Sequence, residues 1–439
     1  MNPALLVDSL WVLLTRLVMR AANFLVFVAL ARALTTAEFG FYGYVITTAL
    51  ILSVSFDLGF RQSGAWLIGK EPHQEQTLVT HLALVITVAG AVGVLVCWLM
   101  LRTGTSVTEY GPLALLAALN VAPMLCLRTG QGVFLGRGEL GKLNRSELIS
   151  RAVVLLGTLG LWGLGRLDLT SALWALLAAH VSAAAYLFWQ IAPEVRLAKL
   201  VDVPLLRRLF RHGLELWIAL VLMILLGRIG FWIVGWQLGD DALGLYFGVQ
   251  RLGEILVEVA TAVGVVIFSH GVRAKDARQS AGEAVRVARL VTSLIAVLVV
   301  ACMFIAAPLL HLALGAEFAT QAWPFRLVML GTIANCFTTM LYPCLSAQGL
   351  ARWGIAAFAA GVAMAALAFS ALTPLQGLVG AGIAYMLAQL TVVALLVAAY
   401  RRRFGFSAAE VLLPQREDLR DLRLMLGHLR SRVLGGRSA

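Results

Sequence analysis

Charged side chains are scarce in this chain. They make up 13% of its 439 residues, whereas a soluble domain carries roughly 25%. So few charges cannot cover a surface exposed to water, and 60% of the residues are hydrophobic. The composition therefore excludes an ordinary soluble protein and indicates a chain that crosses a membrane several times.

Cysteine is also rare. The five cysteines lie in apolar segments, and none has the spacing of a metal site or of a CxxC redox pair. We interpret them as small buried hydrophobic residues without a disulfide or redox role. They are Cys97, Cys126, Cys302, Cys336 and Cys344.

Catalytic signatures are missing as well. The chain has no P-loop, no G-x-S-x-G and no H-E-x-x-H motif. A transfer enzyme or polymerase acting on membrane-bound sugars would need a long ordered loop outside the membrane, and no loop on the predicted outer side exceeds about a dozen residues. We therefore expect a protein that is not an enzyme and that has no cofactor or metal.

Long apolar segments fill most of the sequence. A spanning helix needs about 20 apolar residues, and helices satisfy their own backbone polar groups in lipid. The pattern predicts an all-α polytopic membrane protein with twelve spans. Their ranges are 10–33, 41–68, 78–101, 111–135, 146–165, 169–192, 213–237, 243–268, 287–310, 321–347, 353–373 and 378–400.

Basic residues gather in alternate loops. One set of loops, with the tail from Arg401, holds 24 of the 35 lysines and arginines, and the opposite set holds three. Positive charge is enriched on the cytoplasmic side, so both termini are expected in the cytoplasm. The net charge of +12 is thereby explained by topology, and we expect no nucleic-acid partner.

A repeated pattern indicates an internal duplication. Residues 34–52 and 238–256 match at five positions with a constant offset of 204 residues, including Gly40-x-Tyr42 and Gly244-x-Tyr246. Parallel repeats are a common plan of transport proteins, with the site between the halves. We therefore predict two six-helix lobes related by a pseudo-two-fold repeat, and interpret the repeated turn as hinge-like rather than as a site.

The predicted domains follow from this division. They are an N-terminal six-helix lobe (1–192), a cytoplasmic linker (193–212), a C-terminal six-helix lobe (213–402) and a basic amphipathic cytoplasmic tail (403–439). Leucines recur on one face of the tail among arginines, which is typical of a helix lying on anionic lipid headgroups. A disordered basic tail is the alternative.

Polar residues inside the spans, nearly all of them ionisable, are the candidate functional residues, because each ionisable one costs about 2.5–3.5 kcal/mol to insert. Two groups share a helix face by their spacing, and three further residues lie in other spans. The first group is Arg16, Arg20 and Asn23, the second is Arg251, Glu254 and Glu258, and the others are Asp57, Arg128 and Arg228.

Each candidate has a structural alternative. Asp57 and Arg61 could form an ion pair at a helix end, and Glu254 could serve only as the partner of Arg251. Arg128 and Arg228 have no obvious partner nearby in the sequence. His81 and His180 are interpreted as interhelical contacts rather than as ligands.

Positive charge predominates among these residues. Guanidinium groups bind phosphate and pyrophosphate in a bidentate manner. A cavity lined by them would suit an anionic headgroup and would be a poor site for an organic cation. The sequence therefore predicts an anionic substrate.

The chain resembles the flippases of polysaccharide repeat units, which are the Wzx-type O-antigen and exopolysaccharide exporters of the multidrug/oligosaccharidyl-lipid/polysaccharide superfamily. The resemblance covers spans 1–11 but not the tail. The motifs that carry it are Arg32-Ala33-Leu34-x3-Glu38-Phe39-Gly40-x-Tyr42, Phe56-Asp57-Leu58-Gly59, Arg228 with Gly239-x4-Gly244-x-Tyr246-x3-Gln250-Arg251-Leu252, Gly315-Ala316-Glu317-Phe318 and Ala347-Gln348-Gly349.

The resemblance implies two lobes in a V around a central cavity, in a bacterial plasma (inner) membrane. It implies alternating access that moves an undecaprenyl-pyrophosphate-linked oligosaccharide from the cytoplasmic to the outer leaflet, for lipopolysaccharide or another surface polysaccharide. Polysaccharide polymerase and export machinery would be its partners. Arg16, Arg20 and Arg251 would hold the pyrophosphate, and Asp57, Glu254 and Glu258 would be candidate sites for H+ or Na+ coupling.

Two features depart from related subgroups. The lipid II flippase usually has about fourteen spans, and this sequence predicts twelve. Multidrug exporters commonly carry an acidic residue in the first span, where this chain has Arg16 and Arg20. A cation-coupled multidrug exporter of the same fold is the alternative function.

Overall fold

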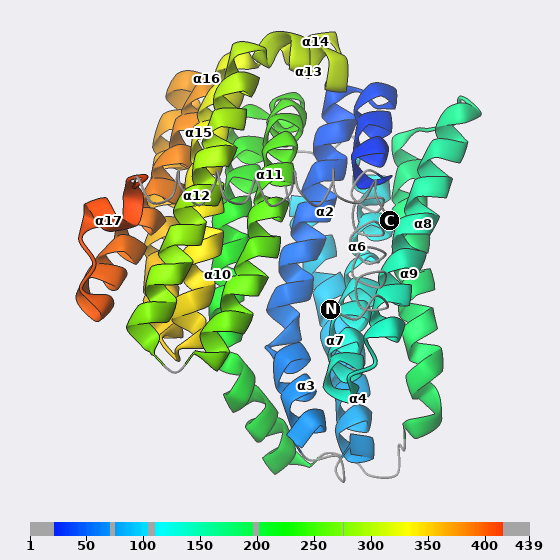
Figure 1. Ribbon diagram of the computed structural model, residues 1–439. Coiled ribbons are helices and arrows are strands. Elements are labelled where there is room, and N and C mark those ends of the chain that lie inside the picture. The colour runs from blue at the N-terminus through cyan, green and yellow to red at the C-terminus, as the bar shows by residue number, and fades with distance from the viewer. Residues whose placement is uncertain (1–21, 71–74, 104–109, 196–201, 275, 416–439) are drawn as a thin grey trace, which may run out of the picture. The chain divides into compact units, whose positions relative to one another are not determined.

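The computed structural model describes residues 22–70, 75–103, 110–195, 202–274 and 276–415. Within these ranges the chain consists of helices joined by turns, without a β-strand (Figure 1). Nine helices in the described ranges are long and apolar enough to cross a membrane. The prediction of an all-α polytopic membrane protein is confirmed.

Packing divides the chain into two compact units. The described part of the first unit runs from residue 22 to Gly248 and also includes His311–Glu317. A helix over Ala22–Ala33 precedes its longer elements. These are α2 (Thr36–Asp57), α3 (Phe60–Lys70), α4 (Glu75–Thr103), α6 (Ala114–Ala118), α7 (Val121–Arg137), α8 (Leu140–Gly163), α9 (Leu169–Ile191), α10 (Val203–Leu238) and the start of α11 (Asp240–Arg273).

The second unit contains the rest of α11 and the helices that follow it. Its described residues are Val249–Leu310 and those from Phe318 to 415, without 275. Its helices are α12 (Ala277–Phe304), the first part of α13 (Ala306–Leu314), the end of α14 (Ala316–Ala319), α15 (Ala322–Ala347), α16 (Ala351–Phe404) and α17 (Ala408–Leu412).

The packing division differs from the predicted boundary at 193–212. Helix α10 was assigned to the C-terminal lobe from the sequence, but it packs against α2 and α3 in the first unit. It begins at Val203, so the part of the predicted linker from 203 onward is helical. The lobe boundary implied by the duplication stays a prediction.

The last two predicted spans are confirmed as separate helical segments of α16. This element has 54 residues, which as one straight helix would be about 80 Å long. Gly377 interrupts it with φ 56° and ψ −136°, a conformation outside the helical region. Glycine reaches positive φ without the steric cost of a side chain, so the break falls between the predicted spans 353–373 and 378–400.

The predicted span 41–68 is wrong as a single helix. It is broken into α2 and α3 at Leu58, with φ 48°, and Gly59, with φ 80°. The backbone of Gly59 lies directly against Gly213 of α10. A β-carbon on Gly59 would come within 2.7 Å of the Gly213 carbonyl oxygen, and one on Gly213 within 2.6 Å of the Gly59 oxygen. Neither position has room for a side chain.

The two repeated glycines contact each other. A β-carbon on Gly244 of α11 would lie 1.9 Å from the Thr36 carbonyl oxygen, and one on Gly40 would lie 2.7 Å from the Gly244 nitrogen. The Thr36 hydroxyl also donates to the Asp241 carboxylate at 2.7 Å. Small residues allow such close backbone approach between helices in a membrane. The repeat is therefore a helix contact in which both copies meet.

Aromatic rings surround this contact. Phe247 packs against Phe39 with ring centroids 5.0 Å apart and against Phe231 at 5.8 Å. Tyr246 packs against Phe231 at 5.4 Å. Edge-to-face pairs of this kind add to the stabilisation from burial, so the glycine contact lies beside a rigid aromatic cluster.

The described start of the tail is attached to the second unit. The Arg289 guanidinium of α12 donates to the Glu410 carbonyl oxygen of α17. Ser407 caps α17, and its backbone N–H donates to the Glu410 carboxylate at 2.6 Å. That hydrogen bond lowers the pKa of the Glu410 carboxyl below its ordinary value. The predicted leucine stripe of the tail lies outside the described residues.

We predict that Gly244→Ala destabilises the protein. The new methyl group would overlap the Thr36 carbonyl, and overpacking of this kind costs typically about 1–3 kcal/mol. The melting temperature of the purified protein should fall. Gly160→Ala in α8 is the matched control, because a β-carbon there meets no atom within 4 Å. Equal melting temperatures for the two variants would contradict the close approach.

Candidate functional site

The Asp57 carboxylate is buried at the end of α2, with 2% of the residue exposed. The helix breaks directly after it, so its Oδ2 accepts the backbone N–H of Arg61 at 3.4 Å. Its Oδ1 accepts the Thr129 hydroxyl of α7 at 2.8 Å. A buried carboxylate needs such donors because lipid and protein interior offer it no water. Asp57 therefore joins α2, α3 and α7.

Arg128 lies beside this carboxylate. It interacts electrostatically with Asp57 and with Arg61. Arg128 has no obvious partner nearby in the sequence, and in the structure the acidic group beside it comes from another helix. Its Nε is buried and has no hydrogen-bond partner among the described residues. A guanidinium that retains an unused donor inside a membrane protein can bind an anion.

Close packing of α3 on α7 brings these residues together. A β-carbon on Gly132 would lie 2.5 Å from the Arg61 carbonyl oxygen, and one on Gly136 would lie 2.7 Å from the Ala65 carbonyl oxygen. The two glycines are one helical turn apart on α7, on the same face. They allow the backbones to approach so that the Asp57, Arg61 and Arg128 charges share one site, which we call the Asp57 cluster.

The other predicted residues of the first unit are only partly described. Arg228 of α10 lies over the Phe231 ring, with its guanidinium carbon 5.4 Å from the ring centroid. This cation–π contact with the aromatic cluster corrects the expectation that Arg228 has no partner. Asn23 is half-buried on the helix Ala22–Ala33. Arg16 and Arg20 lie outside the described residues.

The second unit holds the other predicted charged face, on α11. Arg251 and Glu254 form an ion pair. The geometry therefore agrees with the alternative interpretation, in which Glu254 is the partner of Arg251. Glu254 also interacts electrostatically with Tyr385 of α16. The Tyr385 hydroxyl accepts a hydrogen bond from Asn335 Nδ2 at 3.2 Å. Glu258 is exposed.

The histidines are interhelical contacts, as predicted. His81 Nε2 accepts the Asp202 backbone N–H at 2.6 Å, and its Nδ1 lies 2.7 Å from the Thr77 carbonyl oxygen. This arrangement requires the proton on Nδ1, and it ties the start of α10 to α4. His180 Nδ1 lies 3.0 Å from the buried Asn120 Oδ1.

The described residues hold no group of three or more histidine, cysteine, aspartate or glutamate side chains placed to bind a metal ion. What the described part contains instead is an arginine beside an acid in each unit. These are Arg128 with Asp57 in the first and Arg251 with Glu254 in the second. That the two pairs face one cavity stays a prediction.

Three uncharged residues of these sites were missed from the sequence. Thr129 donates to Asp57, Tyr385 interacts electrostatically with Glu254, and Asn335 donates to Tyr385. Thr129 directly follows Arg128, which is a weak signal because threonine is common in apolar helices. No feature of the sequence near Asn335 or Tyr385 indicates that they lie close to Glu254 in the structure.

Solved structures of other proteins share this fold. A multidrug resistance MATE family transporter of the MOP superfamily, in an inward-facing conformation, matches with a TM-score of 0.69 and 13% identity, over 88% of this chain and 94% of that one. The lipid II flippase MurJ, in an inward closed conformation, matches with a TM-score of 0.69 and 12% identity, over 88% and 87%.

A third match is a MOP superfamily transporter from Pyrococcus furiosus, described as having a binding pocket of reversed polarity. Its TM-score is 0.56 at 14% identity, over 90% of this chain and 92% of that one. At these identities the likeness establishes the fold alone. The chain is therefore a multi-pass membrane protein with the fold of the MOP-superfamily transporters.

The sequence profile of a family then narrows the class. The family described as "Polysaccharide biosynthesis protein" matches residues 5–268. The chain belongs to this family. No curated protein sequence matches it significantly.

We predict that Asp57 and Arg128 are energetically coupled. Asp57→Asn removes the buried carboxylate beside Arg128. Breaking a fully buried pair costs about 3–5 kcal/mol, and the cost is smaller here because Arg128 is half-buried. Asp57→Asn combined with Arg128→Gln should cost clearly less than the sum of the single variants. The measurement is denaturant or thermal unfolding of the purified proteins in a double-mutant cycle.

Arg145→Gln provides the control for this cycle, because Arg145 is an exposed arginine on α8. Its effect should add to that of Asp57→Asn. Additive effects of Asp57→Asn and Arg128→Gln would show that the two groups are not coupled.

Proposed function

We propose that the protein is a flippase that moves an undecaprenyl-pyrophosphate-linked oligosaccharide from the cytoplasmic to the outer leaflet of a bacterial inner membrane, by alternating access, for O-antigen or exopolysaccharide biosynthesis. The family membership supports a role in polysaccharide biosynthesis, and the fold supports transport. The observation that carries the proposal is the half-buried Arg128, whose buried Nε has no hydrogen-bond partner among the described residues and which lies inside a predicted span.

An arginine at this place suits an anionic cargo. Pyrophosphate offers several oxygen acceptors, and a guanidinium can bind two of them at once. The cost of holding a cation among apolar helices is offset when an anion arrives. In the proposal Arg16, Arg20 and Arg251 hold the pyrophosphate together with Arg128 and Arg228, and Asn23 donates a further hydrogen bond.

The neighbouring acids provide a route for coupling to H+ or Na+. Asp57 attracts Arg128, and Glu254 is paired with Arg251. A proton or Na+ on the carboxylate would weaken its hold on the arginine and leave the guanidinium available to the pyrophosphate. Substrate and carboxylate would thus compete for the same cation, and Glu258, which is exposed on α11, is the third candidate. No covalent step is required.

The topology of the proposal follows from charge. Both termini lie in the cytoplasm, where 24 of the 35 basic residues gather. The basic tail contacts anionic lipids on that side. The lipid-linked oligosaccharide is the substrate, and polysaccharide polymerase and export machinery are the proposed protein partners.

A cation-coupled multidrug exporter is the second candidate, and it rests on the shared fold. An organic cation would have to enter a site with more arginines than acids, which disfavours it by charge repulsion. The two functions predict opposite charges of the transported molecule.

Deleting the gene should cause a lipid-linked oligosaccharide to accumulate on the inner leaflet of the bacterial host. Lipid extraction followed by mass spectrometry of the sugar part identifies it. The control is the same strain carrying the gene on a plasmid, which should restore the normal lipid pool and the surface polysaccharide. Normal surface polysaccharide without accumulation would exclude the flippase function.

Arg20→Ala should abolish export while the protein level in the membrane stays constant, because the pyrophosphate loses a cation. Arg20→Lys keeps the charge but not the bidentate geometry, so it should retain part of the activity. Surface polysaccharide and protein level are measured in the same cells. Full export by Arg20→Ala would show that the residue has only a structural role.

A further inference from the structure

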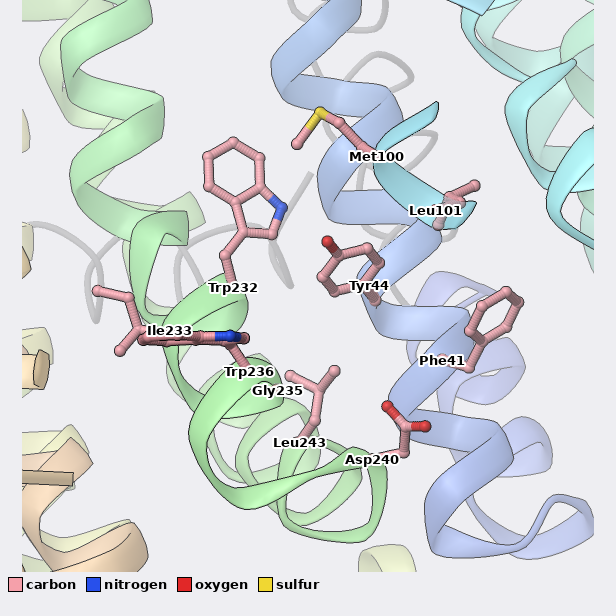
Figure 2. A pocket seen from close by; sticks show the side chains of 10 residues that line it. All are labelled: Phe41, Tyr44, Met100, Leu101, Trp232, Ile233, Gly235, Trp236, Asp240 and Leu243. Carbon is pink, nitrogen blue, oxygen red and sulfur yellow. The ribbon is translucent and has the colours of Figure 1, made fainter. Parts of the chain in front are cut away.

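A pocket in the first unit lies between the ends of four helices. Its volume is about 360 Å³, within the range of about 300–1,000 Å³ that is usual for small-molecule sites. Phe41 and Tyr44 of α2 and Trp232 and Trp236 of α10 contribute aromatic rings, and Asp240 contributes a carboxylate (Figure 2). None of these residues was a candidate from the sequence, and the site is separate from the Asp57 cluster.

The two tryptophans differ in how they are held. The Trp232 indole N–H donates to the Thr48 hydroxyl of α2 at 3.0 Å. Its polar atom is therefore satisfied within the protein, and its orientation is fixed. Trp236, one helical turn further on, is 71% exposed. The pocket thus combines one fixed ring with one accessible ring.

The carboxylate is held in place by the contact between α2 and α11. Asp240 is the first residue of α11. Its carbonyl oxygen would lie 2.3 Å from a β-carbon on Gly40, so the backbone has little freedom. Asp240 also interacts electrostatically with Tyr44. The glycine contact therefore presents an acidic group and a phenol at the same pocket.

This combination of groups matches the chemistry of a sugar. A pyranose ring has apolar C–H faces that lie on aromatic rings, and hydroxyl groups that donate to a carboxylate. Aromatic residues with a polar handle suit ligands of such mixed character. A lipid chain would pack on the rings but could not donate a hydrogen bond to the Asp240 carboxylate, whereas a sugar hydroxyl can.

We propose that this pocket binds one sugar residue of the oligosaccharide at the outer side of the membrane. The pocket lies at the helix ends next to the loops that follow Arg102 and contain Gly239. These loops belong to the set with few basic residues, which is expected on the outer side of the membrane. The inference rests on the proposed function and assigns a neutral or hydroxyl-rich part of the cargo to a site separate from the arginines. The pocket would bind a sugar residue of the oligosaccharide when the headgroup reaches the outer side of the membrane.

Saturation-transfer NMR on the full-length protein in lipid nanodiscs tests the assignment. The probes are methyl glycosides of the monosaccharides present in the surface polysaccharide of the host. The wild-type protein should transfer saturation to the ring protons of at least one glycoside. Trp236→Ala should raise the Kd of that glycoside about tenfold or more, which is the size of effect seen when an aromatic ring stacked on a nucleic-acid base is removed.

Trp189→Ala is the matched control, because Trp189 of α9 is 80% exposed and does not line the pocket. It should leave the Kd unchanged. Asp240→Asn keeps the size of the side chain but loses the charge-assisted hydrogen bonds, and it should raise the Kd about tenfold. Equal effects of Trp236→Ala and Trp189→Ala would show that both rings serve as interfacial anchors and would overturn the assignment.

A cationic probe separates the sugar from an organic cation, since a carboxylate among aromatic rings can also bind an ammonium group. Tetraethylammonium binding that Asp240→Asn abolishes, without glycoside binding, would overturn the assignment and favour the multidrug exporter. The binding assay does not depend on transport. Glycoside binding without lipid accumulation in the deletion strain would refute the flippase and keep the sugar site, whereas accumulation without glycoside binding would refute the sugar site alone.

Discussion

The backbone contact between Gly40 and Gly244 is the constraint on which the first unit depends. It brings the start of α11 against the start of α2 more closely than any side chain would allow. The aromatic cluster around Phe247 packs beside it, and the Asp240 carboxylate is placed by it. In a membrane, where burial from water does not drive helices together, such close van der Waals contact is a main source of helix association.

A second constraint is the absence of water around buried charges. The structure meets it at Asp57, which accepts the Thr129 hydroxyl and interacts electrostatically with Arg128. In the other unit the less buried Arg251 and Glu254 form an ion pair. The buried Nε of Arg128 has no hydrogen-bond partner among the described residues.

The sequence predicted the elements better than their interactions. All eleven predicted spans from residue 41 onward correspond to described helices, although 41–68, 111–135 and 287–310 are each divided between consecutive helices. The division at Leu58 could not be predicted, because a leucine with φ 48° has no local sequence signal. The acidic partner of Arg128 was missed because Asp57 is 71 residues away in the chain.

Hydrophobicity, basic loops and the repeated Gly-x-Tyr pattern are local properties of the sequence. By themselves they indicated a membrane protein and the positions of its helices. The sequence alone also showed the excess of arginine over acid within the spans and the family resemblance. Packing between distant segments alone decided that the repeated glycines touch each other, that Asp57 joins three helices and that two tryptophans share a pocket with Asp240. The physical reason is that short-range patterns determine where a helix forms, whereas its partners depend on which faces approach across long stretches of chain. These are 72 residues between Asp57 and Thr129 and 204 residues between Gly40 and Gly244.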